Sequence, residues 1–172
     1  KPFRIVSVGR LSYAKGFDLA ARALRLLHDR GLGHIRWYIV GFGGQEAELQ
    51  ALIDELGLRD SFRLLGKKAN PYPYMKAADL YVQPSRYEGK AVVVTEAQIL
   101  GKPVLVADYP TAASQVTDGV DGYICPGGAE GIADAIERLV RDREALERVA
   151  EGARRRDYGN ADELKKLYHM IS

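Results

Sequence analysis

The chain has 172 residues, of which 47% are apolar and 28% are charged, as in an ordinary globular domain with one hydrophobic core. Its 25 basic and 23 acidic residues leave a net charge of +2, which argues against nucleic acid as a partner held by bulk charge. The single cysteine excludes an internal disulfide and suits a reducing cytosol, and no apolar run approaches the roughly 20 residues of a membrane span.

Short β-rich runs alternate with helical patterns along the chain. We expect strands at residues 3–9, 35–41, 62–66, 79–84, 103–108 and 122–125. Most are nearly continuous in Val, Ile, Leu and aromatic residues, as in parallel strands that are covered on both faces. Apolar residues at helical spacing predict helices around residues 17–31, 49–57, 91–100 and 132–140. The chain opens directly on a strand-like run, so we expect it to be a fragment of a longer protein.

This order of elements predicts an α/β fold, a Rossmann-like, doubly wound and mostly parallel six-stranded sheet with helices on both faces. Residues 1–153 are expected to form the domain, and residues 154–172, which are polar and loosely periodic, its C-terminal helical tail. Ligands of such sheets bind beyond the carboxyl ends of the strands. The residues that follow the strands, and therefore the candidate site, are 10–16, 42–44, 67–68, 85–91 and 109–111.

Two glutamates stand on either side of the apolar run in the segment EGKAVVVTEAQ. Glu88 precedes the helix expected from Ala91, and Glu96 lies in its second turn, from which its side chain leans back toward the same pocket. The first-turn amides of Ala91, Val92 and Val93 would be unpaired there, and the positive end of the helix suits a phosphate. Carboxylates repel a phosphate, so the glutamates are expected to bind vicinal hydroxyl groups of a ribose or a hexose.

A plainer interpretation competes with this one, because a glutamate inside a helix usually faces solvent and one before a helix often serves as a cap. The helix is, however, apolar on nearly all sides, which predicts burial, and a buried acid needs a partner. Arg10 and Lys15 in the segment GRLSYAKG are expected at the same edge of the sheet. Each alone would be an ordinary surface charge, but together beside a helix N-terminus they can neutralise a diphosphate.

Several motifs in the same order carry a resemblance that covers nearly the whole chain: VGRLSYAKGFD, IVGFGG, FRLLG, AADLYVQPSRYEGKAVVVTEAQILGKPVLVAD and DGVDGYI. Together they resemble the C-terminal, donor-binding half of a retaining glycosyltransferase of the GT-B fold, in family 4 or "glycosyl transferases group 1". Two glutamates with seven residues between them are the signature of that family. Where many members have Phe-Gly, this chain has Lys90-Ala91, which is similar to members of capsule and exopolysaccharide synthesis.

The resemblance implies a role for each candidate residue. Arg10 and Lys15 would bind the donor diphosphate, Glu88 would face the transferred sugar, and these three would be the catalytic residues. Glu96 would hold the ribose hydroxyls of the nucleotide. The resemblance implies further donor-binding residues: Gly9, which precedes Arg10, Gly66 and Lys67 at the base, Gly89, Lys90 and Ala91 at the sugar, and Val92 and Val93 at the phosphate.

The same resemblance implies transfer of a sugar, with retained configuration, from a nucleoside diphosphate sugar to a glycan or lipid-linked acceptor. The sequence has no Asp-x-Asp pair to hold a divalent ion, and fixed cations can stabilise the leaving diphosphate, so we expect no metal and no cofactor. An N-terminal acceptor-binding domain of the same protein is an expected partner. Without it, the chain should bind donor weakly and transfer little.

We expect a cytoplasmic protein. The basic run at 153–156 reads as a solvated face, and a weaker interpretation sets it against anionic lipid at the inner face of the membrane. Two alternatives to a transferase stay open. One is an enzyme like the nucleotide-sugar 2-epimerases, which would use the same diphosphate pocket for proton transfer. The other is a non-catalytic nucleotide-binding module.

Overall fold

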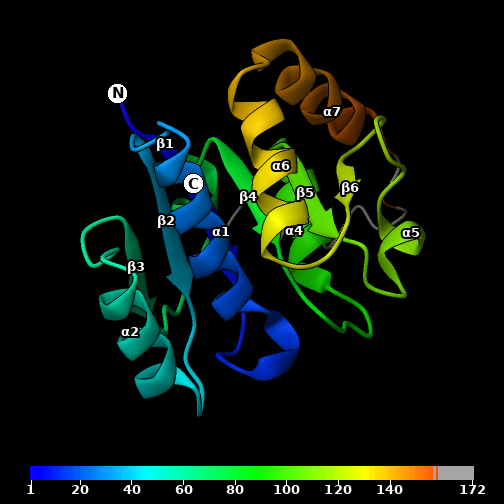
Figure 1. Ribbon diagram of the computed structural model, residues 1–172. Coiled ribbons are helices and arrows are strands. Elements are labelled where there is room, and N and C mark those ends of the chain that lie inside the picture. Colours follow the sequence, from blue (N-terminus) through cyan, green and yellow to red (C-terminus); the bar gives the residue numbers. More distant parts are fainter. Residues whose placement is uncertain (157, 159–172) are drawn as a thin grey trace.

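The computed structural model describes residues 1–156 and 158, and its centre is a six-stranded sheet in the order β3-β2-β1-β4-β5-β6 (Figure 1). All neighbouring strands are parallel. The strands are β1 (Phe3–Val8), β2 (Ile35–Val40), β3 (Phe62–Gly66), β4 (Leu80–Gln83), β5 (Val104–Ala107) and β6 (Tyr123–Cys125). The predicted doubly wound fold is therefore confirmed, in the strand order of the Rossmann fold.

Helices cover both faces of the sheet. One face carries α1 (Phe17–Asp29), α2 (Glu46–Glu55) and α6 (Ala129–Val140), with α7 (Arg143–Arg155) packed against α6. The other carries α3 (Tyr72–Ala77), α4 (Val92–Ile99) and α5 (Ala112–Gln115). Figure 1 shows α1 and α6 side by side over the first face.

Alternation along the strands divides the core into two layers. Ile5 and Leu80 pack with the cluster that includes α1, α2 and α6, whereas their neighbours Val6 and Tyr81 pack with α3, α4 and α5. Successive side chains of a strand point to opposite faces, so nearly continuous apolar strands are what two helical layers require.

The helix after Glu88 is buried or half-buried as predicted, except at Val92 in its first turn. Val94, Ala97 and Gln98 are fully buried, but Val92 in the first turn is 57% exposed. Since α4 packs on β4, β5 and α7 with its other sides, the described residues leave the side that carries Val92 uncovered.

The end of the described chain differs from a solvated basic face. Ala153 is fully buried, and α7 continues through Arg155, which the sequence assigned to the tail. Arg156 reaches inward, where it donates to Gln98 Oε1 at 3.2 Å and to Asp121 Oδ2 at 3.1 Å. The expectation of solvation is thus wrong for Arg156, because the 8% exposed Asp121 carboxylate needs a counter-charge. Residues 159–172 of the predicted tail lie outside the described residues. Among the residues that the structure describes, no helix is long and apolar enough to cross a membrane.

Candidate functional site

An ion pair between Lys15 and Glu88 lies at the carboxyl edge of the sheet. Lys15 ends the short 3-10 helix η1 (Tyr13–Lys15) after β1, and Glu88 lies in the loop between β4 and α4. The ammonium Nζ is 2.8 Å from both carboxylate oxygens. Only 5% of the Glu88 side chain and 25% of the Lys15 side chain are exposed. A carboxylate so far withdrawn from water needs a cation beside it, and Lys15 supplies one.

Arg86 fastens the two loops that carry this ion pair. Its guanidinium binds both oxygens of Asp18, at 2.8 and 2.7 Å, and stacks on the Tyr13 ring at 3.9 Å. The backbone amides of Arg86 and Tyr87 donate to the carbonyl of Ala14. Burial raises the pKa of Asp18, but the hydrogen bonds and charge of Arg86, together with backbone hydrogen bonds, outweigh burial and hold that pKa below its ordinary value. The loop after β1 and the loop after β4 therefore form one unit.

Arg10 is the free cation of the predicted pair. It follows β1, it is exposed, and its guanidinium has no hydrogen bond or ion pair among residues 1–156 and 158. The backbone around it is held, since Gly9 N–H donates to Val40 O at 3.0 Å and Leu11 N–H to Phe42 O at 2.9 Å. Arg10 is thus an exposed, unpaired cation on a hydrogen-bonded backbone segment, five residues before Lys15.

Glu96 lies in α4, where the Tyr72 hydroxyl of α3 donates to its Oε2. Burial first, and then the Glu96 carboxylate, raise the pKa of Tyr72 to about 12, so the phenol stays a donor at neutral pH. Burial also raises the pKa of the Tyr81 hydroxyl, and the charges of Glu88 and Glu96 both add to that rise. The charges of both glutamates therefore act on one buried phenol.

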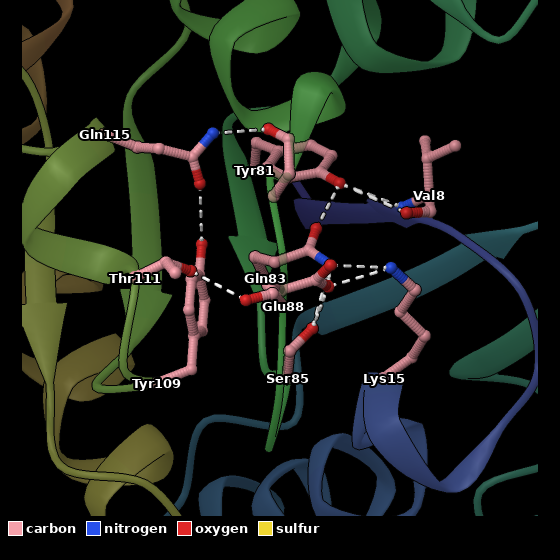
Figure 2. Close-up of polar contacts among 10 residues, drawn as sticks. Val8, Lys15, Tyr81, Gln83, Ser85, Glu88, Tyr109, Thr111 and Gln115 are labelled. Atoms are coloured by element: carbon pink, nitrogen blue, oxygen red, sulfur yellow. Dashed lines mark hydrogen bonds and ion pairs between the residues drawn. The ribbon is translucent and has the colours of Figure 1, made fainter.

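The loop after β5 and helix α5 together hold the loop that links Glu88 to α4. Thr111 Oγ1 donates to the Glu88 carbonyl at 2.8 Å, and Gln115 Nε2 donates to the Ala91 carbonyl at 2.8 Å (Figure 2). In a planar trans peptide the N–H points opposite to the preceding C=O. The Gly89 N–H is therefore turned away from Thr111.

The amides at the start of α4 are not all free as predicted. Ala91 has φ −81° and ψ 81°, a tight inverse γ-turn, and this turn pairs the Val92 N–H with the Lys90 carbonyl at 3.0 Å. The prediction is thus wrong for Val92. The amides of Gly89, Lys90, Ala91 and Val93 donate to no acceptor in the described part of the chain.

The residues predicted near a base lie at the ends of β2 and β3. Gly66, with φ 78°, accepts the Gly41 N–H at 2.9 Å. Lys67 Nζ lies 5.0 Å from the ring centroid of Phe42, which is 51% exposed. Cation and ring thus face each other across the strand ends, and the location of the base stays a prediction.

Three partners of the site lie outside the segments that the sequence predicts for it: Tyr72, Gln83 and Gln115. Three others lie inside those segments, although no individual role is predicted for them from the sequence: Ser85, Arg86 and Thr111. Gln83 had a signal, since it is the polar residue of the otherwise apolar strand segment LYVQ. Within the described residues no three His, Cys, Asp or Glu side chains are grouped to hold a metal ion.

Comparison with known proteins decides the family. Residues 1–156 match the family described as "Glycosyl transferases group 1". The chain belongs to this family. It is 32% identical over 148 residues to the amylovoran biosynthesis glycosyltransferase AmsK of Erwinia amylovora, with 81% of this chain and 36% of that protein covered. It is 33% identical over 152 residues to the alpha-D-kanosaminyltransferase of Streptomyces kanamyceticus, with 87% and 39% covered. The chain thus spans well under half the length of these family members.

Solved structures of glycosyltransferases share the fold. Anabaena HepE in complex with UDP and glucose superposes with a TM-score of 0.83 at 27% identity, over 99% of this chain and 47% of that chain. The C-terminal domain of the group 1 family protein LpcC from Francisella tularensis gives a TM-score of 0.78 at 19% identity, over 99% and 87%. The second likeness bears on the fold alone, and it confirms that the chain corresponds to one half of a GT-B structure.

Proposed function

We propose that this chain is the donor-binding half of a retaining, metal-independent glycosyltransferase, which moves a sugar from a nucleoside diphosphate sugar to a glycan or lipid-linked acceptor. The observation that carries the proposal is the withdrawn Lys15–Glu88 ion pair at the carboxyl edge of the sheet, with the unpaired Arg10 five residues upstream. Similar proteins add support, because HepE has been crystallised with UDP-glucose and AmsK is an amylovoran biosynthesis glycosyltransferase.

The chemistry follows from where charge develops. As the glycosidic bond stretches, negative charge grows on the leaving diphosphate and positive charge on the sugar. Arg10, Lys15 and the unpaired amides of Ala91 and Val93 stabilise the diphosphate, and fixed donors of this kind need no reorganisation during the reaction. Glu88 binds the transferred sugar, and Glu96 binds the ribose hydroxyls.

The Glu96→Gln variant tests the ribose contact. We expect it to weaken binding of the preferred nucleoside diphosphate by about tenfold, the worth of one hydrogen bond to a charged group, and to leave binding of the 2′-deoxy analogue nearly unchanged. Calorimetry with uridine, guanosine and adenosine diphosphates, each with its deoxy analogue, measures both. The exposed Glu55 of α2 gives the matched control, Glu55→Gln. Equal losses for the ribose and deoxyribose forms would remove Glu96 from the ribose.

Metal independence is tested on a protein that includes the N-terminal acceptor-binding domain. Because Arg10 and Lys15 neutralise the diphosphate in the proposed mechanism, EDTA should leave the rate of sugar transfer unchanged. Loss of transfer in EDTA, with recovery on adding Mg²⁺ or Mn²⁺, would contradict the proposal.

The alternatives are separated by their products. A 2-epimerase-like enzyme releases a free epimer where a transferase forms a glycoside, and a nucleotide-binding module does neither.

A cytoplasmic location is part of the proposal. Membrane contact through the basic run at 153–156 draws little support, since Arg154 and Arg155 both bind Glu151 and Arg156 binds Asp121.

A further inference from the structure

Two buried polar side chains hold Glu88 from beneath the edge of the sheet. Gln83 ends β4, and its Nε2 donates to Glu88 Oε2 at 2.9 Å and to Ser85 Oγ at 3.0 Å, so both amide hydrogens are engaged. Ser85 Oγ donates in turn to the same Oε2 at 2.6 Å. Gln83 is fully buried and Ser85 is 3% exposed. Figure 2 shows both beside Glu88, with Lys15 on the other side.

The orientation of the Gln83 amide is fixed at its other end. Tyr81 Oη donates to Gln83 Oε1 at 2.6 Å and accepts the Val8 N–H at 3.2 Å. A carboxylate only accepts hydrogen bonds, so the nitrogen of the amide must face Glu88 and its oxygen must face Tyr81. Turning the amide over would lose both contacts inside the core.

The two oxygens of Glu88 are occupied unequally. Oε2 accepts from Lys15, Gln83 and Ser85, whereas Oε1 accepts from Lys15 alone, at 2.8 Å. A carboxylate offers about four acceptor sites, two on each oxygen. Among the contacts of the described residues, Oε2 is therefore saturated and Oε1 keeps one site.

We propose that Gln83 and Ser85 are positioning residues, which hold Glu88 by Oε2 so that Oε1 accepts a single hydroxyl of the donor sugar. The inference rests on the proposed function, in which Glu88 faces the transferred sugar. The sequence led us to expect that Glu88 binds two vicinal hydroxyl groups. The structure favours a single hydroxyl group, because Oε2 of Glu88 is already hydrogen-bonded inside the protein.

The Gln83→Leu variant removes the amide and keeps most of its volume. We define the sugar contribution as the dissociation constant of a nucleoside diphosphate divided by that of the corresponding nucleoside diphosphate sugar. The first probes are UDP and UDP-glucose, followed by the corresponding guanosine and adenosine pairs. We expect this ratio to fall about five- to tenfold, with binding of the diphosphate alone changed less than about twofold. An unchanged ratio would overturn the inference.

The chain offers a matched control in Gln98, another fully buried glutamine, which donates to Asp121 O and accepts from Arg156. Gln98→Leu removes a buried amide of the same kind that does not touch Glu88. It should lower the free energy of unfolding and leave the sugar contribution unchanged. If Gln98→Leu lowers the sugar contribution as much as Gln83→Leu does, the effect comes from a general loss of stability. The proposal that Gln83 positions Glu88 is then refuted.

The Gln83→Glu variant keeps the shape and makes the donor depend on pH. The new carboxyl group can donate to Glu88 only while it holds a proton, and two neighbouring carboxyl groups share a proton over several pH units. We expect a sugar contribution near the wild-type value at about pH 5 that is lost by about pH 8. Other charged or titratable groups also face Glu88, namely Lys15 of η1, Tyr81 of β4 and Tyr109 after β5. Because the wild-type chain contains the same three groups, its sugar contribution measured over the same pH range is the reference.

Glu88→Gln separates this inference from the function on which it rests. If that variant leaves the sugar contribution unchanged, Glu88 does not bind the sugar and the proposed role falls, together with its positioning residues. If Glu88→Gln lowers the ratio while Gln83→Leu and the pH series of Gln83→Glu do not, positioning alone is refuted. Failure of every nucleotide in the panel to bind the wild-type chain would overturn both.

Discussion

Replacing Lys15 with methionine should cost both stability and diphosphate binding. The change leaves the carboxylate of Glu88, 5% exposed, without its cation, and breaking such a pair lowers the free energy of unfolding by about 3 kcal/mol. The affinity for the nucleoside diphosphate should fall at least about tenfold, because a hydrogen bond to a charged phosphate is lost. Urea unfolding and calorimetry measure the two effects separately.

A double variant keeps the two effects apart. Adding Glu88→Gln to Lys15→Met removes the unpaired charge, so most of the lost stability should return while the diphosphate affinity stays low. If the double variant also recovers the affinity, Lys15 serves only to neutralise Glu88 and does not bind phosphate. Lys76, exposed on α3, provides the control Lys76→Met, which should change neither quantity.

The fold could be predicted because its determinants are local. Each strand is a short apolar run, and α1 and α6 each carry an apolar stripe facing one layer of the core. The short helices α3 and α5 were missed because six and four residues are too few for a helical period to show. The exposure of Val92 was also missed, since the sequence does not say which side of α4 the neighbouring elements leave open.

The candidate site could be predicted only in part, for a related reason. Lys15 and Glu88 each follow a strand, and the rule that parallel strands present their carboxyl ends at one edge brings them together. The contacts of Arg86 with Asp18 and of Thr111 with the Glu88 carbonyl join residues that are 68 and 23 positions apart in the sequence. Such pairs depend on the backbone conformation of the loops, which cannot be predicted from the spacing of residues in the sequence. A structural role for Gln83 could have been predicted from the sequence, because a buried side-chain amide in a strand needs hydrogen-bond partners.

Replacing Gly41 with alanine should weaken the fold, because the added methyl group meets the backbone of a neighbouring loop. Gly41 has φ 150°, and a Cβ atom there would stand 1.8 Å from the carbonyl oxygen of Gly9. The backbones of the loops after β1 and β2 must separate to admit it, at a cost of about 3 kcal/mol in the free energy of unfolding. Trp37, the only tryptophan, is fully buried in the adjoining strand β2, so its fluorescence in urea reports the loss.

Gly44 in the same GFGG segment is the matched control. A Cβ atom at Gly44 would meet nothing within 4 Å, so Gly44→Ala should change the stability by less than about 0.5 kcal/mol. Gly41→Ala should in addition weaken diphosphate binding, because the loop that it displaces carries Arg10. If the folded Gly41→Ala chain binds the diphosphate as the wild type does, the position of the loop after β1 does not set the affinity. Arg10 would then reach the phosphate from any loop position, and the close approach of Gly41 to Gly9 would serve stability alone.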